Sequence, residues 1–411
     1  MRDNSYQFKM APGIDHANRD VFEDIYHLRP SGMDDIFVNK KLLVPEFLPP
    51  EDQIVEREQE ISTLNKTLRK AALGFSLENT LVYGPKGSGK SLITRHVCRR
   101  VRGSAVNDNE IGFAYADCRE KRTTSSLVAT IARQLNKERE TGTAIPETGV
   151  SVDGYWQKLA SIVNRRHPVI ILLLDSIDRI DPEELAPVIR AESRLPVPVG
   201  IVAVCDRCEV PPSIQRYQDQ SVIQKSIEVE QYDRGQLEEI LRVRSAAFDR
   251  GVLSEGVLST ILNVDLVTNA HKAITAFRTA GECAVRSGDT EVRPEHVHEA
   301  REPIGKRLFY EQVRYAPEHT KIGLAALADL CGKSSDNTFR TVEVYDRYQQ
   351  LCKERSVDSV SSRHLRELLK SRIINDIINY KKVNHGVAGG VYIDMELCVD
   401  PEIVQSVLRD G

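Results

Sequence analysis

The stretch GPKGSGKS, residues 84–91, decides how this chain folds. It matches the pattern G-x-x-x-x-G-K-[S/T] and lies between a short apolar stretch, residues 79–85, and a helix-like stretch, residues 91–102. Glycines let the backbone curl so that successive amides point at phosphate oxygens, and the following helix N-terminus adds a favourable field. We therefore predict a loop that binds ATP or GTP with Mg²⁺, although a chance match in a turn is the alternative. Its predicted nucleotide-binding residues are Gly84, Pro85, Lys86, Gly87, Ser88, Gly89, Lys90, Ser91 and Leu92.

Outward from this loop, short apolar stretches alternate with helix-like stretches as far as residue 205. This alternation predicts a parallel sheet with helices on both faces. Residues 51–73 follow two prolines and place apolar residues at helical spacing, which predicts one helix. The strand-like stretches are residues 79–85, 111–118, 169–175 and 199–205, and the helix-like stretches are residues 91–102, 125–136, 154–166 and 182–192.

The rest of the chain has a different pattern. Residues 233–315 contain helix-like stretches only, which predicts a small helical lid. From about residue 319, three helix-like stretches precede two strand-like stretches joined across the glycine-rich turn 384–390, the outline of a winged helix-turn-helix. The predicted fold class is α/β: a P-loop parallel-sheet domain, a helical lid and a C-terminal winged helix-turn-helix domain. The predicted boundaries are 1–35 for an N-terminal arm, 36–230, 231–310 and 311–411.

Composition excludes several classes of protein. The longest apolar run, Val169–Leu174, is too short to cross a bilayer, and no apolar signal region begins the chain, so we expect a cytoplasmic protein without a membrane partner. The net charge of −4 means that any DNA contact must come from a local basic patch. Cys205 and Cys208 form a lone C-x-x-C without matched further ligands, so reduced thiols are favoured over zinc or redox chemistry.

Asp175 closes the apolar stretch 169–175. A carboxylate at this place can hold magnesium together with Ser91, so Ser91 and Asp175 are the predicted metal residues. An aspartate is also a common way to end a strand, but the phosphate loop favours the magnesium role.

Taken together, the segments resemble the archaeal replication initiators of the origin-recognition-complex and cell-division-control family. The resemblance implies an AAA+ ATPase module, a helical lid and a winged helix that binds double-stranded origin DNA. It also implies recruitment of the replicative helicase, homologous initiator subunits as possible partners, and an initiator-specific insertion near 119–149 as a second DNA contact. The segments that carry it are residues 36–50, 55–61, 84–91, 116–135, 145–159, 172–178, 228–244 and 269–284.

Two lid residues follow from the same resemblance. Tyr232 resembles the family tyrosine that packs near the adenine, and Arg244 resembles the lid arginine that approaches the nucleotide. A core aromatic residue and a solvated helix charge are the alternatives.

The sequence departs from the family at four places that concern hydrolysis. Ser176 stands where a glutamate activates water, and a serine hydroxyl is no base at neutral pH. The other departures are Cys205 in place of a γ-phosphate-sensing asparagine, Ser213 where an arginine finger is common, and His271 where the lid has a sensor arginine. We therefore predict a nucleotide binder that hydrolyses poorly, and leave open whether the chain is a useful enzyme.

The predicted DNA surface lies near the C-terminus. Residues 363–382 contain six basic residues and two acidic residues, a net charge of +4. If residues 361–370 form the recognition helix, its first residues reach base edges or phosphates. A solvated face or a protein-docking surface would explain the same charges, and the wing tip lacks an arginine. The predicted DNA-binding residues are Ser361, Ser362, Arg363, Arg366, Lys370, Lys381 and Lys382.

The leading functional hypothesis is an ATP-binding DNA replication initiator that recognises origin DNA and helps recruit the replicative helicase. Two alternatives stay open: an initiator-derived DNA-binding regulator that holds ATP structurally, and an ATPase remodeller with a protein-docking winged helix.

Overall fold

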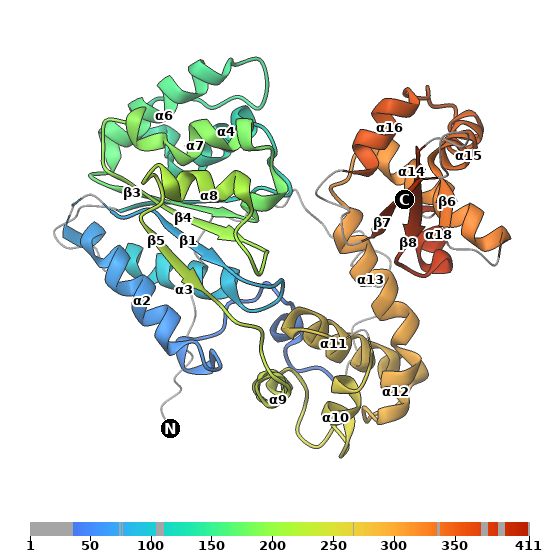
Figure 1. Cartoon of the computed structure of the whole chain (residues 1–411). Coiled ribbons are helices and arrows are strands. Elements are labelled where there is room, and N and C mark those ends of the chain that lie inside the picture. The colour runs from blue at the N-terminus through green and yellow to red at the C-terminus, as the bar shows by residue number, and fades with distance from the viewer. Residues whose placement is uncertain are drawn as a thin grey trace, which may run out of the picture.

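The computed structural model describes residues 36–409 apart from 74, 76, 104–110, 266, 335–337, 371–376 and 385–390. The predicted N-terminal arm and wing tip lie outside these residues. Within the described part, the chain forms a parallel sheet with helices on both faces, a group of lid helices, and a C-terminal helical body with a small antiparallel sheet (Figure 1). The predicted fold class is confirmed.

The central sheet has five parallel strands in the order β2-β3-β4-β1-β5. Because all strands run in the same direction, their C-terminal ends meet at one edge, which is where ligands bind in open α/β sheets. The phosphate loop leaves β1 at this edge. The strands are β1 (Thr80–Tyr83), β2 (Gly112–Asp117), β3 (Ile170–Asp175), β4 (Val199–Cys205) and β5 (Lys225–Glu228).

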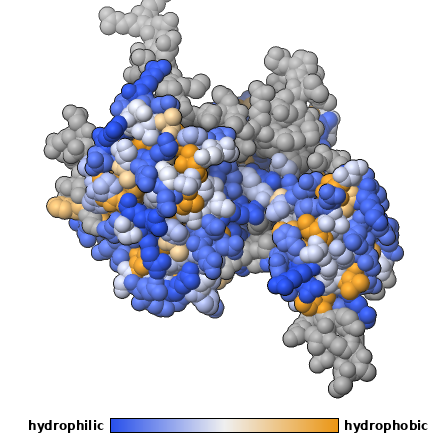
Figure 2. Space-filling view, turned by 90° about the horizontal axis from the view of Figure 1, so that it is seen from above, coloured by the Kyte–Doolittle hydropathy of each residue, from blue (hydrophilic) through white to orange (hydrophobic). Residues whose placement is uncertain are grey.

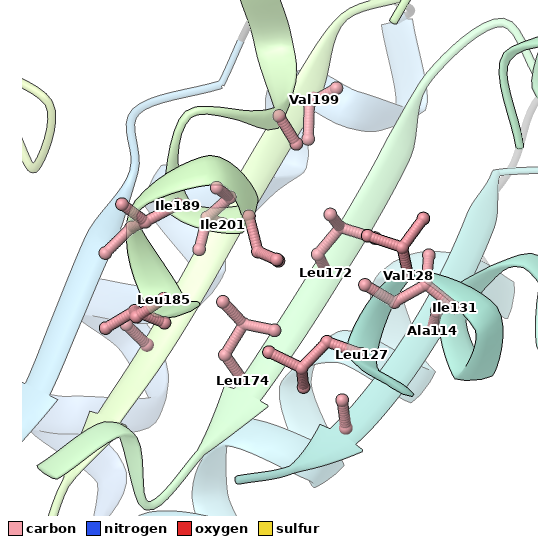
Figure 3. Packing of buried hydrophobic residues seen from close by; sticks show 14 of the residues in the cluster. Ala114, Leu127, Val128, Ile131, Leu172, Leu174, Leu185, Ile189, Val199 and Ile201 are labelled. Atoms are coloured by element: carbon pink, nitrogen blue, oxygen red, sulfur yellow. The ribbon is translucent and has the colours of Figure 1, made fainter. Parts of the chain in front are cut away.

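Apolar residues cover the sheet on both faces because neighbouring strand residues point in opposite directions. Leu172 and Leu174 of β3 pack on one side, toward helix residues such as Leu127 (Figure 3), whereas Ile171 and Leu173 pack on the other side. The first face is covered by α4 (Thr124–Leu135), α6 (Val152–Arg166), α7 (Pro182–Ile189) and α8 (Pro212–Asp219), and the second by α2 (Glu58–Leu68) and α3 (Lys90–Gly103).

The lid also includes the first described segment of the chain. Phe37 packs against Phe248 with ring centroids 4.9 Å apart, and Lys40 forms a 3.0 Å ion pair with Glu282. A Cβ on Gly281 would lie 2.5 Å from the Phe37 ring, so this glycine makes room for the segment. The start of the predicted 36–230 domain therefore packs in the lid cluster. The lid helices are α9 (Arg234–Arg244), α10 (Val257–Leu262), α11 (Ala270–Ser287) and α12 (Pro294–Glu299).

Helix α13 (Arg301–Val313) connects the lid to the C-terminal body (Figure 1). That body is a winged helix with three helices, an antiparallel sheet in the order β6-β8-β7, and a closing helix. Its apolar cluster contains Leu365 and Leu369 on the third helix and Val404 on the closing helix. Its elements are α14 (Glu318–Lys333), β6 (Thr338–Arg340), α15 (Thr341–Glu354), α16 (Ser362–Leu369), β7 (Ile378–Asn384), β8 (Val391–Leu397) and α18 (Pro401–Arg409).

Some elements differ from the sequence expectation. The helix expected over 51–73 begins only at Glu58, because Glu56 has a left-handed φ of 45° that breaks the helical path. The stretch 294–309 forms two helices, α12 and α13, instead of one. Strands β5 and β6 and helices α8 and α18 were not expected. The remaining short elements are α5 (Glu138–Thr141) and 3₁₀ turns at Lys40–Leu43, Glu51–Gln53, Arg69–Leu73, Ile177–Arg179, Ala191–Ser193 and Ser245–Ala247.

The length and apolar character of the described helices bear on whether they can span a membrane. None of them combines the length and apolar character that crossing a bilayer requires.

Candidate functional sites

The phosphate loop has the backbone that its glycines predicted. Gly84, Gly87 and Gly89 have φ values of 149°, 79° and 94°, a region that residues with a side chain rarely adopt. A Cβ on Gly84 would lie 2.1 Å from the Val229 carbonyl oxygen, and one on Gly89 would lie 2.7 Å from the Tyr232 hydroxyl oxygen. Conformation and space therefore both require glycine in this loop.

The lid contacts the loop through the N-terminus of α11. Asn269 caps this helix by accepting a 3.0 Å hydrogen bond from the Lys272 amide. A Cβ on Gly87 would lie 2.5 Å from the Asn269 side chain, so the loop and the helix cap are in direct contact. The lid thus closes over the phosphate loop.

A cavity lies between the loop, the C-terminal edge of the sheet, the lid and the end of α13. Its position is the one where the sequence predicted a nucleotide. The predicted residues that line it are Lys86, Gly87, Gly89, Lys90, Ser91, Leu92, Asp175, Tyr232 and Arg244. Gly84, Pro85 and Ser88 belong to the loop but not to the lining.

Lys90 is buried and held at the cavity wall. Its Nζ donates to the Pro85 carbonyl at 2.6 Å and forms a 2.9 Å ion pair with Asp206. Burial alone would raise the pKa of Asp206, but the charge and hydrogen bond of Lys90 hold it below its usual value. The lysine is therefore ready to exchange one anionic partner for another, as phosphate binding requires.

Asp206 corrects one expectation. The sequence placed Cys205 at the γ-phosphate-sensing position, but Cys205 is the last residue of β4 and is buried in the apolar cluster. The next residue, Asp206, lines the cavity and contacts Lys90. Sequence reasoning missed it because the direction of a side chain at a strand end depends on where the strand ends. An acidic residue directly after an apolar strand was the available signal.

Asp175 and Ser91 form an oxygen-rich site beside the loop. The Ser91 hydroxyl donates to one oxygen of Asp175 at 3.0 Å, and the Tyr115 hydroxyl donates to the other at 3.2 Å. Burial, together with the nearby charges of Asp206 and Asp117, raises the pKa of Asp175 to about 6. Oxygen donors that carry concentrated negative charge fit a hard cation such as Mg²⁺.

Ser176 leaves the position after Asp175 without a base. Its backbone is left-handed, with a φ of 56°, and its hydroxyl donates to Asp206 at 3.3 Å. Asp178 does not replace the missing acid, because it accepts the Asp206 amide at 3.0 Å and pairs with Arg179 and Arg207 at 3.3 and 3.4 Å. These contacts assign Asp178 to holding the loop after β4.

Tyr232 lies where the sheet domain meets the lid. The Arg57 guanidinium lies 3.9 Å from the centroid of its ring. Arg57 also donates to the Ser88 carbonyl at 3.2 Å and to the Glu230 carbonyl at 2.8 Å. The tyrosine is therefore fixed between the phosphate loop and the chain that enters the lid, with its ring at the cavity wall.

Arg244 is engaged by main-chain carbonyl groups. Its guanidinium donates to Leu42 at 2.7 Å and to Phe47 at 3.4 Å, and lies 5.3 Å from the Phe47 ring centroid. It lines the cavity while it fastens the N-terminal segment to the lid. Its contact with a nucleotide stays a prediction.

The other departures from the family have defined surroundings. His271, in the first turn of α11, pairs with Glu311 of α13 at 2.5 Å. Both residues line the cavity together with Arg314, which follows α13. Ser213 is the second residue of α8, and Arg216 in the same helix donates to the Pro182 carbonyl at 3.2 Å. Glu311 and Arg314 were missed by sequence reasoning, because no local pattern joins a helix end to a loop over 200 residues away in the chain.

The C-x-x-C pair shows no metal-like arrangement. Cys205 is buried and Cys208 is exposed, and both are free thiols. No cluster of three or more histidine, cysteine or acidic residues suited to a metal occurs in the described part of the chain.

The predicted recognition helix is α16. Ser361 caps it by accepting a 3.3 Å hydrogen bond from the His364 amide, and Leu365 and Leu369 bury one side. Arg363 is exposed and pairs with Glu367 at 3.2 Å. Ser362 and Arg366 are partly buried and Lys370 is exposed.

The other predicted DNA residues lie on β7. Lys381 pairs with Glu396 of β8 at 2.8 Å. The structure describes only the backbone of Lys382, and the wing tip lies outside the described residues. In the view of Figure 2 the sheet domain and the winged helix form two lobes, and the described surface is mostly hydrophilic with scattered apolar residues.

The predicted insertion near 119–149 contains α4 and α5. One side of α4 is buried against β2 and α6 through residues such as Leu127 and Ile131. Arg122, at its start, donates to the Tyr315 carbonyl beside the winged helix. A DNA contact by this segment stays a prediction.

Comparison with known proteins identifies the parts of the chain. Residues 53–198 match the family model of an AAA ATPase domain. Residues 238–302 match the Cdc6 AAA+ ATPase-type lid domain, and residues 311–407 match the C-terminal winged helix domain of CDC6.

Similar proteins cover nearly the whole chain. ORC1-type DNA replication protein 4 of Halobacterium salinarum is 36% identical over 396 residues, which are 93% of this chain and 97% of that protein. The structure of the Aeropyrum pernix ORC1 protein in complex with DNA is 26% identical, with a TM-score of 0.75, and covers 92% of this chain and 97% of that one. Cdc6p from Pyrobaculum aerophilum, at 19% identity, a TM-score of 0.53 and coverage of 91% and 99%, shares the fold.

Proposed function

This chain belongs to the ORC1/Cdc6 family of DNA replication proteins, and we propose that it is an ATP-binding initiator that recognises origin DNA and helps recruit the replicative helicase. The observation that carries the proposal is the cavity, which is walled by the phosphate loop, by the lid and by the end of the helix that leads into the winged helix. A ligand in this cavity would lie against the loop, the lid and the end of α13. Helicase recruitment and assembly with homologous subunits rest on family membership.

In this proposal, different residues of the cavity hold different parts of ATP. The loop amides and Lys90 bind the phosphates, and Tyr232 with Arg57 forms a wall at the lid entrance for the adenosine end. Ser91 and Asp175 would hold Mg²⁺, which supplies positive charge to the β- and γ-phosphates. Lys90 leaves Asp206 for the phosphates, while Ser176 keeps a hydrogen-bond donor beside that carboxylate.

Hydrolysis is slow in this proposal because the residue after Asp175 is Ser176, whose hydroxyl is no base at neutral pH. A positioned general base contributes about a hundredfold to ten-thousandfold in rate. Single-turnover hydrolysis tests this point: the wild type turns over slowly, and Ser176→Glu accelerates the step. A fast wild-type rate that collapses in Asp175→Asn would show that another group activates water.

DNA binding is proposed for the winged helix, with α16 at its surface. Arg363, Lys370 and Lys381 are exposed cations that suit phosphate contacts, and such contacts position a protein without reading sequence. The similar Aeropyrum protein has been solved in complex with DNA, which supports a DNA-binding role for this fold. ATP orders the lid and winged helix so that the two grip duplex DNA together.

Two measurements on the full chain test the proposal. Calorimetry with Mg²⁺ and ATP detects uptake in the wild type, and uptake is lost when Lys90 is replaced by alanine. Footprinting on the replicon that encodes the chain shows protection at repeats in the origin. Protection at a promoter alone favours the regulator, and binding that ignores sequence favours the remodeller.

A further inference from the structure

Two residues of the cavity wall, Glu311 and Arg314, belong to neither the sheet domain nor the lid. Arg314 directly follows α13, precedes α14 of the winged helix, and lines the same cavity as Lys90. Helix α13 runs from the lid to the winged helix (Figure 1). An arginine at this junction therefore faces the nucleotide site from the beginning of the winged-helix body.

Within the described part of the chain, the buried Nε atom of Arg314 lacks a hydrogen-bond acceptor. Glu311, one turn earlier on α13, is hydrogen-bonded to His271, and the Arg314 charge acts on this carboxylate without a hydrogen bond. The Arg314 guanidinium lies over the Tyr315 ring, 4.6 Å from the centroid, which fixes its plane without using its donors. A buried cationic donor without an acceptor is costly, so such a group in a native fold calls for an explanation.

Two carboxylates of the cavity wall are already engaged by other groups. Asp175 accepts hydroxyl hydrogen bonds from Ser91 and Tyr115, and Asp206 pairs with Lys90. An anion that enters the cavity would bring acceptor oxygens, and guanidinium groups match phosphate geometry through two parallel hydrogen bonds. We infer that Arg314 is a ligand for the phosphate chain of the bound nucleotide, an inference that rests on the proposed binding of ATP in this cavity.

Hydrogen bonds from the sheet domain and from α14 hold the main chain at Arg314 and Tyr315. Arg122 of the sheet domain donates to the Tyr315 carbonyl, and Lys321 of α14 donates to the Arg314 carbonyl at 3.4 Å. Arg122 also donates to the Arg119 carbonyl at 3.0 Å, and Arg119 forms paired hydrogen bonds with Asp117 at the end of β2. Arg314 therefore couples phosphate binding in the cavity to the position of α14, through the short stretch of main chain between α13 and α14.

The test compares Arg314→Met with Arg301→Met in the full chain. Both changes remove one positive charge from the same helical region, but Arg301 is exposed, pairs with Asp265 and does not line the cavity. Methionine keeps the apolar stem of arginine and removes its donors. Thermal unfolding is followed without nucleotide and with Mg²⁺ plus ATP or ADP, and dissociation constants are measured by calorimetry.

The inference predicts a specific pattern. Without nucleotide, Arg314→Met melts no lower than the wild type, because an unsatisfied donor has been removed. Its affinity for ATP falls about tenfold to a hundredfold, and the rise in melting temperature with ATP shrinks accordingly. Arg314→Lys keeps the charge and loses less. If ADP affinity is unchanged, the contact is with the terminal phosphate, and if it falls equally, the contact is with the inner phosphates.

Other outcomes overturn the inference. A lower melting temperature without nucleotide, combined with an unchanged rise on adding ATP, would give Arg314 a purely structural role. Unchanged behaviour in both states would mean that water satisfies the guanidinium. If the wild type itself takes up no ATP, the proposed function fails, whereas ATP binding by the wild type and equal binding by Arg314→Met refute the role of Arg314 alone.

Two native cysteines allow the coupling to be measured. Cys208 of the sheet domain and Cys398 of the winged helix are exposed, whereas the other six cysteines are buried. Spin labels on these two thiols report the distance between the bodies by pulsed electron resonance. ATP shifts the distance distribution in the wild type and in Arg301→Met but not in Arg314→Met. A shift that survives in Arg314→Met would contradict the coupling.

Discussion

Charged side chains are buried and paired in the nucleotide cavity, whereas they are exposed on the winged-helix surface. In the cavity, Lys90 is 2% exposed and Asp175 is 3% exposed, and both are bonded to other parts of the site. On the winged helix, the Arg363 side chain is 88% exposed and that of Lys381 is 56% exposed, and each pairs with one neighbouring glutamate. The first region is an interlocked set of charges, and the second is a set of separate ones.

This difference sets the size of the effects that substitutions cause. A buried charge that loses its partner remains in a poorly solvated place, whereas an exposed charge is compensated by water and salt. We therefore expect large, coupled effects in the cavity and small, nearly additive, salt-dependent effects on the winged helix.

The largest effect is expected for Lys90→Ala. It leaves the Asp206 carboxylate without its cation and should lower the free energy of unfolding by about 3 kcal/mol, as well as abolish ATP uptake. The double variant Lys90→Ala/Asp206→Asn removes the unpaired charge and should recover most of the stability but none of the binding. Urea unfolding measures the first quantity and calorimetry the second. A double variant as unstable as the single one would show that the charges are not coupled.

The next effect concerns pH in protein without nucleotide or metal. The pKa of Asp175 is raised to about 6, whereas an unfolded aspartate titrates near 4. The protonated carboxyl therefore stabilises the fold below about pH 4, and this contribution is lost as the pH rises through 6. Between pH 4 and pH 7, the unfolding free energy of the wild type should fall by about 3 kcal/mol relative to that of Asp175→Asn. An equal difference at pH 4 and pH 7 would disprove the shift.

A smaller effect is expected for Gly87→Ala, with Gly142→Ala as its control. Both glycines have left-handed φ values, 79° and 64°, and this alone costs about 1–2 kcal/mol for alanine. Only the new Cβ at position 87 meets an obstacle, the Asn269 side chain, whereas nothing lies within 4 Å at position 142. Thermal unfolding should show the larger loss for Gly87→Ala, together with weaker ATP binding. Equal losses of stability in the two variants would mean that the Asn269 side chain moves aside without a cost in free energy.

The smallest effects are expected on the winged helix. Arg363→Ala should weaken duplex binding less than tenfold and lower the salt slope by about one unit, because it removes one phosphate contact. Glu367→Ala frees Arg363 from its ion pair and should strengthen binding slightly. Fluorescence anisotropy over a range of salt concentrations measures both. A hundredfold loss in Arg363→Ala would place this arginine in an interlocked site like that of the cavity.

The sequence predicted best what depends on local pattern. The glycine spacing of residues 84–91 predicted the loop, because the strand before it and the helix after it are both recognisable from adjacent residues. The helical spacing of the leucines in α16 indicates one apolar side, on which Leu365 and Leu369 are buried and Leu368 is partly buried. These features need only neighbouring residues, so their outcome is determined along the chain.

The remaining features depend on contacts between distant segments. Asp206, Glu311 and Arg314 reach the cavity only through the register of β4 and the direction of α13. Arg244 was predicted near the nucleotide, but its hydrogen bonds go to carbonyl groups about 200 residues earlier in the chain. No local sequence pattern predicts such contacts, because they depend on how the domains pack against one another.

The central claim is that ATP in the cavity controls the grip of the winged helix on DNA. Its most direct test is the dissociation constant of the full chain for origin duplex, measured by anisotropy at fixed salt with and without Mg²⁺ and ATP. The account predicts distinctly tighter binding with ATP, and no such gain in Lys90→Ala/Asp206→Asn. An identical constant in both conditions, in protein that calorimetry shows to be loaded with ATP, would contradict it.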